Sequence, residues 1–120
     1  MEETLDDLFE FVRNTFFPRW DKDRKWKLKV LKDMNGYDGK CVNCEKEIHS
    51  NVKFNDHSKE ERIRILIHEI VHSFSGSSHG KIWNTRMLKV ADKAITRGYN
   101  ELADLLRKEI QEYQDLAEEI

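Results

Sequence analysis

The sequence is poor in the residues that define several classes of protein. It contains one proline, five glycines and two cysteines in 120 residues, and it has no low-complexity tract or internal repeat. Two cysteines are too few to form the several disulfide bonds that stabilise a small secreted protein. No apolar run approaches the roughly 20 residues that span a bilayer. These absences exclude a disulfide-rich scaffold and a membrane-spanning protein, and the length suits one domain with a modest core.

An excess of charge of one sign is also missing. The chain has 21 Lys and Arg against 23 Asp and Glu, a formal net charge of −2. The two signs are interleaved, so there is no general electrostatic footprint for nucleic acid. The one basic cluster, RWDKDRKWKLKVLK, alternates lysines with apolar residues, as on the solvated face of a strand. The N-terminal MEETLDDLFE is acidic and lacks the layout of a signal peptide, so we expect a cytoplasmic protein with no membrane partner.

Hydrophobic periodicity predicts an α+β fold in the order helix, small sheet, three helices. The spacing of apolar residues predicts a first helix over residues 5–17, capped by Thr4 and ended by Pro18. Alternation with a period of two in KWKLKVLK and EIHSNVKF, with CVNC between them, predicts a three-stranded antiparallel sheet. The segment DMNGYDGK supplies turn residues before CVNC.

After the predicted sheet the apolar period becomes helical. Ser58 and Glu61 predict a capping box at the start of a helix that ends near Gly76. A third helix is predicted over residues 80–97, and Asn100 is suited to cap a fourth. Apolar residues are most closely spaced in the first of these three helices, so we expect it to be the most buried.

The stretch HEIVHSFSGSSHGKIW, which begins at His68, carries the chemistry of this chain. His68 and His72 are four residues apart, so on a helix they share one face, about 5–6 Å apart between Cβ atoms, and can bind one zinc ion. Glu69 lies one step round the helix and can contact a water on the metal as a general base. His79 follows a short Ser/Gly turn and can supply the third protein ligand that a catalytic zinc needs. Histidines in an apolar helix need partners, which favours a metal site over a chance match.

This stretch resembles the core of the SprT-like family of zincin metalloproteases, whose pattern is H-E-x-x-H, a turn, and H-G-x-x followed by an aromatic residue. The matching residues are His68, Glu69, His72, His79, Gly80 and Trp83. The resemblance covers residues 24–97 and implies a single minimal SprT-like domain over residues 1–120. It implies that the three histidines bind Zn2+ and that Glu69 is the catalytic base. It also implies that a peptide substrate adds as an antiparallel strand to an edge strand within residues 48–54.

By this resemblance the chain is a hydrolase, a zinc metalloendopeptidase that cleaves unfolded or extended protein segments. Zinc lowers the pKa of its bound water towards about 7 and polarises the scissile carbonyl. Glu69 takes the proton and later delivers it to the leaving amine. The developing oxyanion needs a further donor. The candidates are Tyr99, Tyr37 and Arg97, and the sequence does not choose among them.

Two other interpretations stay open. The first is a zincin-like protein-binding module with a structural or inactive zinc site. The turn between His72 and His79 is shorter than in many members of the family, which leaves few residues to shape a specificity pocket. The second is a minimal gluzincin in which Glu101 or Glu109 replaces the third histidine. The DNA-binding extension of some members is missing, so nucleic acid is not an expected partner, whereas an exposed edge strand can support a homo-oligomer.

The cysteine pair Cys41-x-x-Cys44 is half of a four-cysteine zinc site, and the sequence has no second pair. His49 and His57 can complete a Cys2His2 site in principle, but one lies on a predicted strand face and the other in a linker. We therefore expect two reduced thiols at a turn and two surface histidines.

The predicted third and fourth helices are expected to complete the core. Trp83 is expected to pack the third helix against the motif helix. Met87, one turn further on, lies within a helix and so does not form a Met-turn. The fourth helix either completes the core alone or also folds over the cleft, where Glu118 or Glu119 would reach the zinc and make the enzyme latent.

Overall fold

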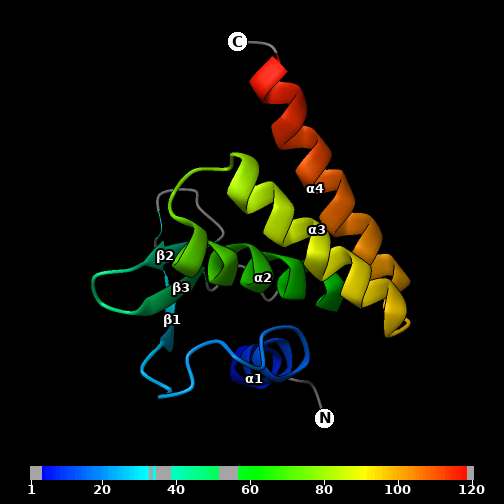
Figure 1. Cartoon of the computed structure of the whole chain (residues 1–120). Helices are drawn as coiled ribbons and strands as arrows, with labels where there is room; N and C mark the ends of the chain where they lie inside the picture. Colours follow the sequence, from blue (N-terminus) through cyan, green and yellow to red (C-terminus); the bar gives the residue numbers. More distant parts are fainter. Residues whose placement is uncertain (1–3, 33, 35–38, 52–56, 119–120) are drawn as a thin grey trace.

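The structure is a computed structural model that describes residues 4–32, 34, 39–51 and 57–118. For residues 117 and 118 it describes the backbone only. Within these residues the order is one helix, three strands and three helices, which confirms the predicted α+β fold (Figure 1). The elements are α1 (Leu5–Phe16), β1 (Lys27–Leu31), β2 (Gly39–Val42), β3 (Glu47–Asn51), α2 (Lys59–Ser75), α3 (Lys81–Thr96) and α4 (Asn100–Glu118). The predicted turn at residues 35–38 and the predicted strand end at residues 52–54 lie outside the described residues.

The first two helices begin at side-chain caps. In α1, Thr4 Oγ1 accepts a hydrogen bond from Asp7 N at 3.1 Å, and Asp7 Oδ2 accepts one from Thr4 N at 3.1 Å. This is a complete capping box. In α2, Ser58 Oγ accepts from Glu61 N at 3.2 Å. The Glu61 carboxylate bonds to Arg64 instead of returning to the cap, so the predicted second capping box is only half formed.

The sheet is mixed, which corrects the predicted antiparallel arrangement. Its order is β1-β3-β2, so β3 is the central strand. β3 pairs with β1 in parallel and with β2 antiparallel, and Ile48 lies opposite both Leu28 and Cys41. β2 runs antiparallel to β3 along the edge that is opposite to β1, whereas β1 and β3 run in the same direction. The predicted alternation holds for Ile48 and Ser50 of β3, which are buried, but Val30 of β1 is 47% exposed. Alternation does not specify strand direction, because it is the same in parallel and antiparallel pairs.

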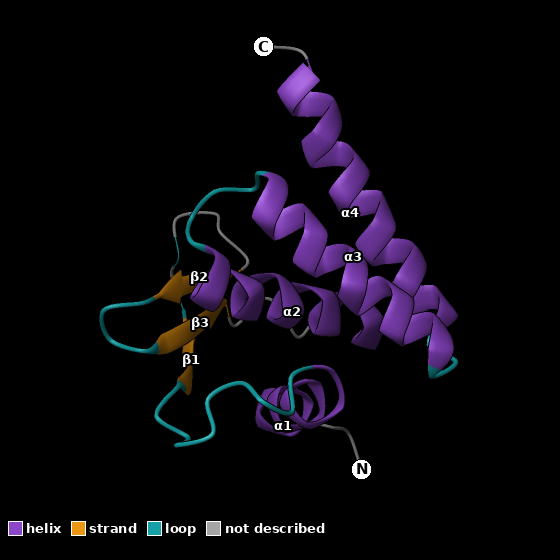
Figure 2. Cartoon of the chain, viewed as in Figure 1, coloured by secondary structure: helices purple, strands orange, loops and turns teal. Residues whose placement is uncertain are grey.

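Helix α2 lies at the centre of the molecule, as its apolar sequence predicts. It packs against α1, α3, α4 and β2 (Figures 1 and 2). Its core residues Leu66, Ile67, Ile70 and Val71 are at most 1% exposed. Burial of such side chains is the main favourable contribution to folding. The motif helix is therefore held on several sides, which gives a rigid base for the side chains at its C-terminal end.

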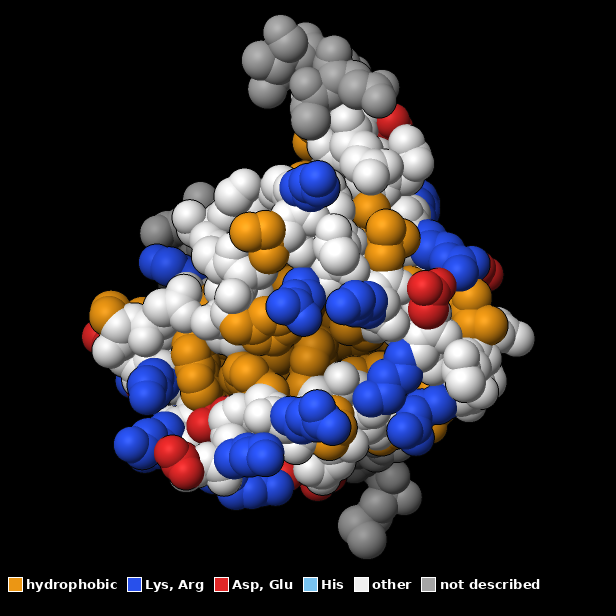
Figure 3. Space-filling view, viewed as in Figure 1, with side chains coloured by type: hydrophobic (Ala, Val, Ile, Leu, Met, Phe, Trp, Pro, Cys, Tyr) orange, Lys and Arg blue, Asp and Glu red, His pale blue; other side chains and the backbone are white. Residues whose placement is uncertain are grey.

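The face shown in Figure 3 has an apolar hollow bordered by basic side chains. The hollow lies over α2, between α1 and α3, and lysine and arginine side chains gather around it. No described histidine is visible on this face, so the histidine site opens elsewhere. In the part of the chain that the structure describes, no helix combines the length and the apolar character needed to cross a membrane.

Candidate metal centre

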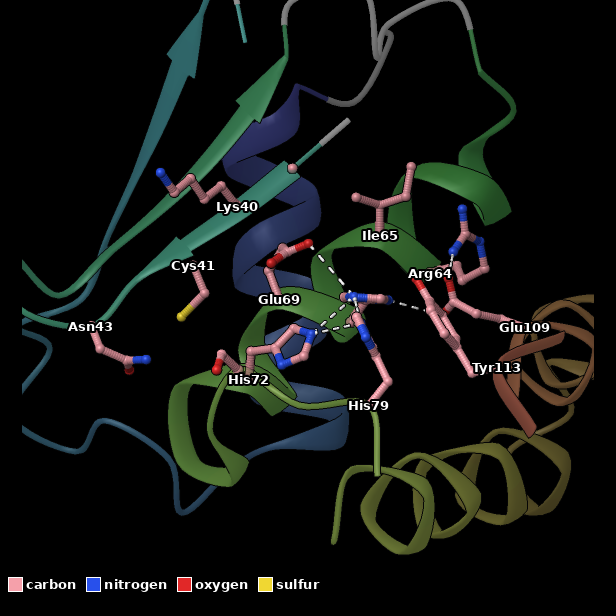
Figure 4. A pocket seen from close by; sticks show the side chains of 13 residues that line it. Lys40, Cys41, Asn43, Arg64, Ile65, Glu69, His72, His79, Glu109 and Tyr113 are labelled. Carbon is pink, nitrogen blue, oxygen red and sulfur yellow. Dashed lines mark hydrogen bonds and ion pairs between the residues drawn. The ribbon is translucent and has the colours of Figure 1, made fainter. Parts of the chain in front are cut away.

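Three histidines from two segments converge at the C-terminal end of α2. His68 and His72 lie on one face of α2, and His79 lies in the connection between α2 and α3. The Nε2 atoms are 3.1 Å apart between His68 and His72, and 3.0 Å apart in each pair that includes His79. In Figure 4 the labelled rings of His72 and His79 point toward one another. The structure thus brings together the three residues that the sequence predicts as ligands.

A reversal of the chain at Gly76 brings His79 back to the helix. Gly76 has φ of 88°, a left-handed conformation that favours glycine, and its N–H donates to the His72 carbonyl oxygen at 3.2 Å. The chain then returns along the end of α2, and α3 begins after its cap, Gly80. The short turn is therefore long enough to close the cluster.

The outer nitrogens of two of these rings face oxygen atoms. His72 Nδ1 lies 2.7 Å from the Gly76 carbonyl oxygen, and His68 Nδ1 lies 3.2 Å from Glu109 Oε1. A neutral ring that carries its proton on Nδ1 presents a lone pair at Nε2. Burial lowers the pKa of His72 and, together with the neighbouring histidines, lowers the pKa of His79 to about 4. Lone pairs that face one another at such short range repel unless a cation lies between them.

The spacing of these nitrogens fits one zinc ion. With Zn–N distances of about 2.0–2.1 Å and tetrahedral angles, two ligand nitrogens are about 3.3 Å apart. The observed separations of 3.0–3.1 Å are within a few tenths of an ångström of that value. Among the described residues, the group that meets at this point contains only the three histidines. Three neutral imidazoles are the donor set of a catalytic zinc, whereas a structural zinc takes four protein ligands.

Glu69 lies beside the histidine cluster and not within it. Its Oε2 is 3.9 Å from His68 Nε2, and the residue is only 8% exposed. Burial raises the pKa of the Glu69 carboxyl, and the nearby His68 offsets this only in part. A raised pKa suits a carboxylate that must accept a proton near neutral pH.

A cavity of about 540 Å³ opens at the cluster, between β2 and α4. One wall is formed by β2, through Gly39, Lys40 and Cys41, and the opposite wall by Glu109 and Tyr113 of α4 (Figure 4). The histidines and Glu69 form the base of the cavity, from α2 and the turn that follows it. The cavity therefore brings a strand, the motif helix and the C-terminal helix together around one point.

The strand beside the cavity is β2, which corrects the predicted substrate edge within residues 48–54. The described part of that range, up to Asn51, is the central strand and is paired on both sides. Within the described residues β2 pairs only with β3, so its other edge is open on the cavity side. The prediction failed because it placed the last strand of the sequence at the edge of the sheet.

Trp83 packs beneath the three rings. It is 1% exposed, and its ring centroid lies 5.2 Å from that of His68 and 4.9 Å from that of His79. It is nearly parallel to the His72 ring, at 24° and 6.1 Å. This confirms that Trp83 joins α3 to the motif helix. Met87 lies within α3, as predicted, and the structure shows that it is fully buried.

A known family matches most of these elements. The family model described as the SprT-like family matches residues 5–104. The chain belongs to the SprT-like family. The match includes β2, the three histidines and Glu69, and it ends within α4. Membership relates this SprT-like chain to the zincin metalloproteases, and no curated protein matches it.

Sequence reasoning placed the fourth helix over the cleft of this SprT-like site as one alternative, but through Glu118 or Glu119, whose side chains lie outside the described residues. It did not predict that Glu109 and Tyr113 contact the histidine rings. The Tyr113 ring stacks on the His79 ring, with centroids 3.9 Å apart and planes at 9°. Glu109 contacts His68 Nδ1 and pairs with Arg64. The spacing of apolar residues in the fourth helix, Tyr113 among them, indicates a buried face but does not indicate which element that face meets.

Neither glutamate of the gluzincin alternative meets the three Nε2 atoms. Glu109 contacts His68 at Nδ1, on the other side of that ring. Glu101 lies in the first turn of α4 and lines a separate cavity with Phe11 and Tyr99. In this SprT-like structure the converging group contains His79 instead.

The described candidates for an oxyanion donor lie away from the cavity. Tyr99 packs on Phe11, with ring centroids 5.7 Å apart, and Arg97 ends α3 as its C-cap. Tyr37 lies outside the described residues. The phenol on the cavity wall is Tyr113, and burial raises the pKa of its hydroxyl, which keeps the proton available for donation.

The cysteines do not join His49 and His57 in a Cys2His2 site among the described residues. Cys41 and Cys44 are free thiols in β2 and the turn after it, as predicted. Cys41 faces the cavity, and burial raises its pKa to about 12. His49 contacts Glu47 at 2.9 Å, and His57 is exposed just before α2.

Proposed function

We propose that this SprT-like protein is a zinc metalloendopeptidase in which His68, His72 and His79 hold Zn2+ and Glu69 is the general base. The observation that carries the proposal is the convergence of three Nε2 atoms to 3.0–3.1 Å, with a buried carboxylate beside them. When bound, zinc polarises the scissile carbonyl and lowers the pKa of a water molecule. Three protein ligands leave a position for that chemistry.

Glu69 is placed to move the proton. Its carboxylate is close to His68 Nε2 but does not belong to the ligand group. Because burial raises its pKa, it can take a proton from the attacking water and hold it until the leaving amine accepts it. Tyr113, on the cavity wall, is the candidate donor for the negative charge that develops on the carbonyl oxygen.

The substrate class follows from the open edge of β2. An extended peptide can pair with such an edge through main-chain hydrogen bonds. This mode of binding selects backbone that is free of its own secondary structure, since a folded segment has its N–H and C=O groups already paired. The arrangement therefore favours unfolded or extended protein segments as substrates.

Metal content and cleavage, measured on one preparation, test the proposal. Purified protein is assayed for bound zinc and then mixed with unfolded casein before chelation, after chelation and after zinc is returned. We expect about one zinc ion per chain. Cleavage should disappear on chelation and return with zinc. A protein that binds no zinc would contradict the proposal.

A second candidate is a zincin-like protein-binding module. The observation in its favour is the close approach of α4, whose Glu109 and Tyr113 occupy one wall of the cavity and leave few residues to shape a specificity pocket. In that case zinc binds and stabilises the protein, but no casein is cleaved in any of the three conditions.

Gly39→Ala is expected to lower kcat/KM by roughly tenfold while leaving zinc content unchanged. A Cβ at Gly39 would lie 3.1 Å from Ile65 Cγ2 and 3.2 Å from Glu69 Cγ. Either β2 or the Glu69 side chain must therefore move by a few tenths of an ångström, which displaces the substrate strand or the base. Steady-state cleavage and zinc analysis measure the two effects, and a parallel loss of zinc would contradict this account.

A further inference from the structure

One face of α4 contacts two of the three histidine rings. Glu109 and Tyr113 are four residues apart, so they share that face. Glu109 Oε1 lies 3.2 Å from His68 Nδ1, and the Tyr113 ring is stacked on His79. Both side chains line the cavity and come from a helix that the chain reaches only after α3 (Figure 4). The histidine cluster is therefore supported from outside the motif helix.

The Glu109 carboxylate is buried and held between two side chains of α2. Its side chain is 11% exposed, and Oε2 forms an ion pair with Arg64. Arg64 also bonds to Glu61, at 3.1 and 3.0 Å, which fixes the guanidinium on the surface of α2. Oε1 is buried without a well-aligned hydrogen bond among the described residues, and it faces His68 Nδ1. A buried carboxylate oxygen is costly unless a donor meets it, and the imidazole N–H is the donor at hand.

We infer that Glu109 is a positioning residue for the metal ligand His68. An acceptor at Nδ1 keeps the proton on that nitrogen, leaves the lone pair on Nε2 and makes the imidazole a stronger ligand. His72 has such a partner in its own segment, the Gly76 carbonyl oxygen. His68 lies in the helix interior, where the backbone carbonyls are already paired, so its partner comes from another element. Helix α4 supplies that partner, and Arg64 keeps it in place.

The consequence is that zinc binding and the docking of α4 stabilise each other, because linkage between two equilibria is reciprocal. The match to the SprT-like family ends at residue 104, before Glu109, so this support lies outside the part of the chain that the family model covers. The inference rests on the proposed zinc site, but it does not depend on peptidase activity.

Zinc affinity, measured by competition with a chromophoric chelator, tests this inference. The parent is compared with Glu109→Ala, with Glu109→Gln and with the control Glu112→Ala, which removes an exposed glutamate from the same helix. We expect Glu109→Ala to weaken zinc binding by about 10–100-fold. Glu109→Gln should weaken it by a smaller factor, since its amide oxygen still accepts from Nδ1. Glu112→Ala should match the parent.

The visible spectrum of the cobalt-substituted protein provides a second measurement. It reports on the geometry at the metal, and we expect it to change in Glu109→Ala and to return toward the parent in Glu109→Gln. A role in packing alone would lower the unfolding temperature without changing either the spectrum or the affinity of the folded protein.

The outcomes separate the inference from the proposed function. Parent-like zinc affinity in both Glu109 variants would overturn the inference, even if both variants unfold at lower temperature. If Glu109→Ala does not fold, Glu109→Gln decides, and an affinity equal to that of the parent overturns the inference. If the parent protein binds no zinc, the proposed function itself is contradicted.

Discussion

Glu69→Gln is expected to lower kcat/KM for casein cleavage by about 10²–10⁴-fold while zinc stays bound. Glutamine has nearly the shape of glutamate and can occupy the same place, 3.9 Å from His68 Nε2, but its amide cannot accept the proton. Because Glu69 does not belong to the ligand group, its loss should leave metal content unchanged. Cleavage rate and bound zinc are measured on the same preparation.

The matched control for this prediction is Glu60→Gln, which changes a glutamate in the first turn of α2, away from the cavity. It should cleave as the parent does. Burial raises the pKa of Glu69, which means that its charged form is disfavoured in the folded state. Replacing it with a neutral amide is therefore not expected to destabilise the fold. Equal cleavage by Glu69→Gln and the parent would point to a contaminating protease or to a mechanism without this base.

Removal of zinc is expected to lower the unfolding temperature by roughly 10 °C or more. A ligand that binds only the folded state stabilises it by about 4 kcal/mol when its free concentration is about 1,000 times its Kd. In the structure three Nε2 atoms face one another at 3.0–3.1 Å, and their lone pairs repel when no cation lies between them. His72→Ala should show the lower unfolding temperature and no response to zinc. Calorimetry with zinc and with a chelator measures both effects.

The control for the zinc prediction is His57→Ala, which removes an exposed histidine outside the cluster and should leave the response to zinc intact. An unfolding temperature of the parent that is the same with zinc and with chelator would refute the prediction. The two predictions also separate two roles of the site. Glu69→Gln should keep the stabilisation by zinc and lose cleavage, whereas His72→Ala should lose both.

The motif was recognisable because its parts lie close together in the sequence. His68 and His72 share a helix face through their spacing alone, and Gly76 marks the point where the chain must turn. Helix α2 also has the apolar sequence and the Ser58 cap that a buried helix needs. These features depend on interactions between near neighbours, so the candidate ligand set and the motif helix could be predicted with the structure unseen.

The sheet was predicted only in part, since alternation specifies which residues face the core and not which strands are neighbours. The same pattern in β1 and β3 is compatible with parallel and antiparallel pairing. The structure pairs these two strands in parallel and places β2 at the edge beside the cavity. The strand proposed to bind substrate is therefore β2 and not the predicted stretch within residues 48–54.

The support of the site from α4 is a property of the tertiary fold. Arg64 and Glu109 are 45 residues apart in the sequence, and they meet only because α4 packs back against α2. A single glutamate on a charged helix has the same neighbours in the sequence whether it faces solvent or a buried histidine. The packing of α4 buries Glu109 beside His68 and leaves Glu112 exposed. Interactions within a few residues of chain can thus specify the candidate ligands, whereas the side chains that surround them depend on how distant helices pack together.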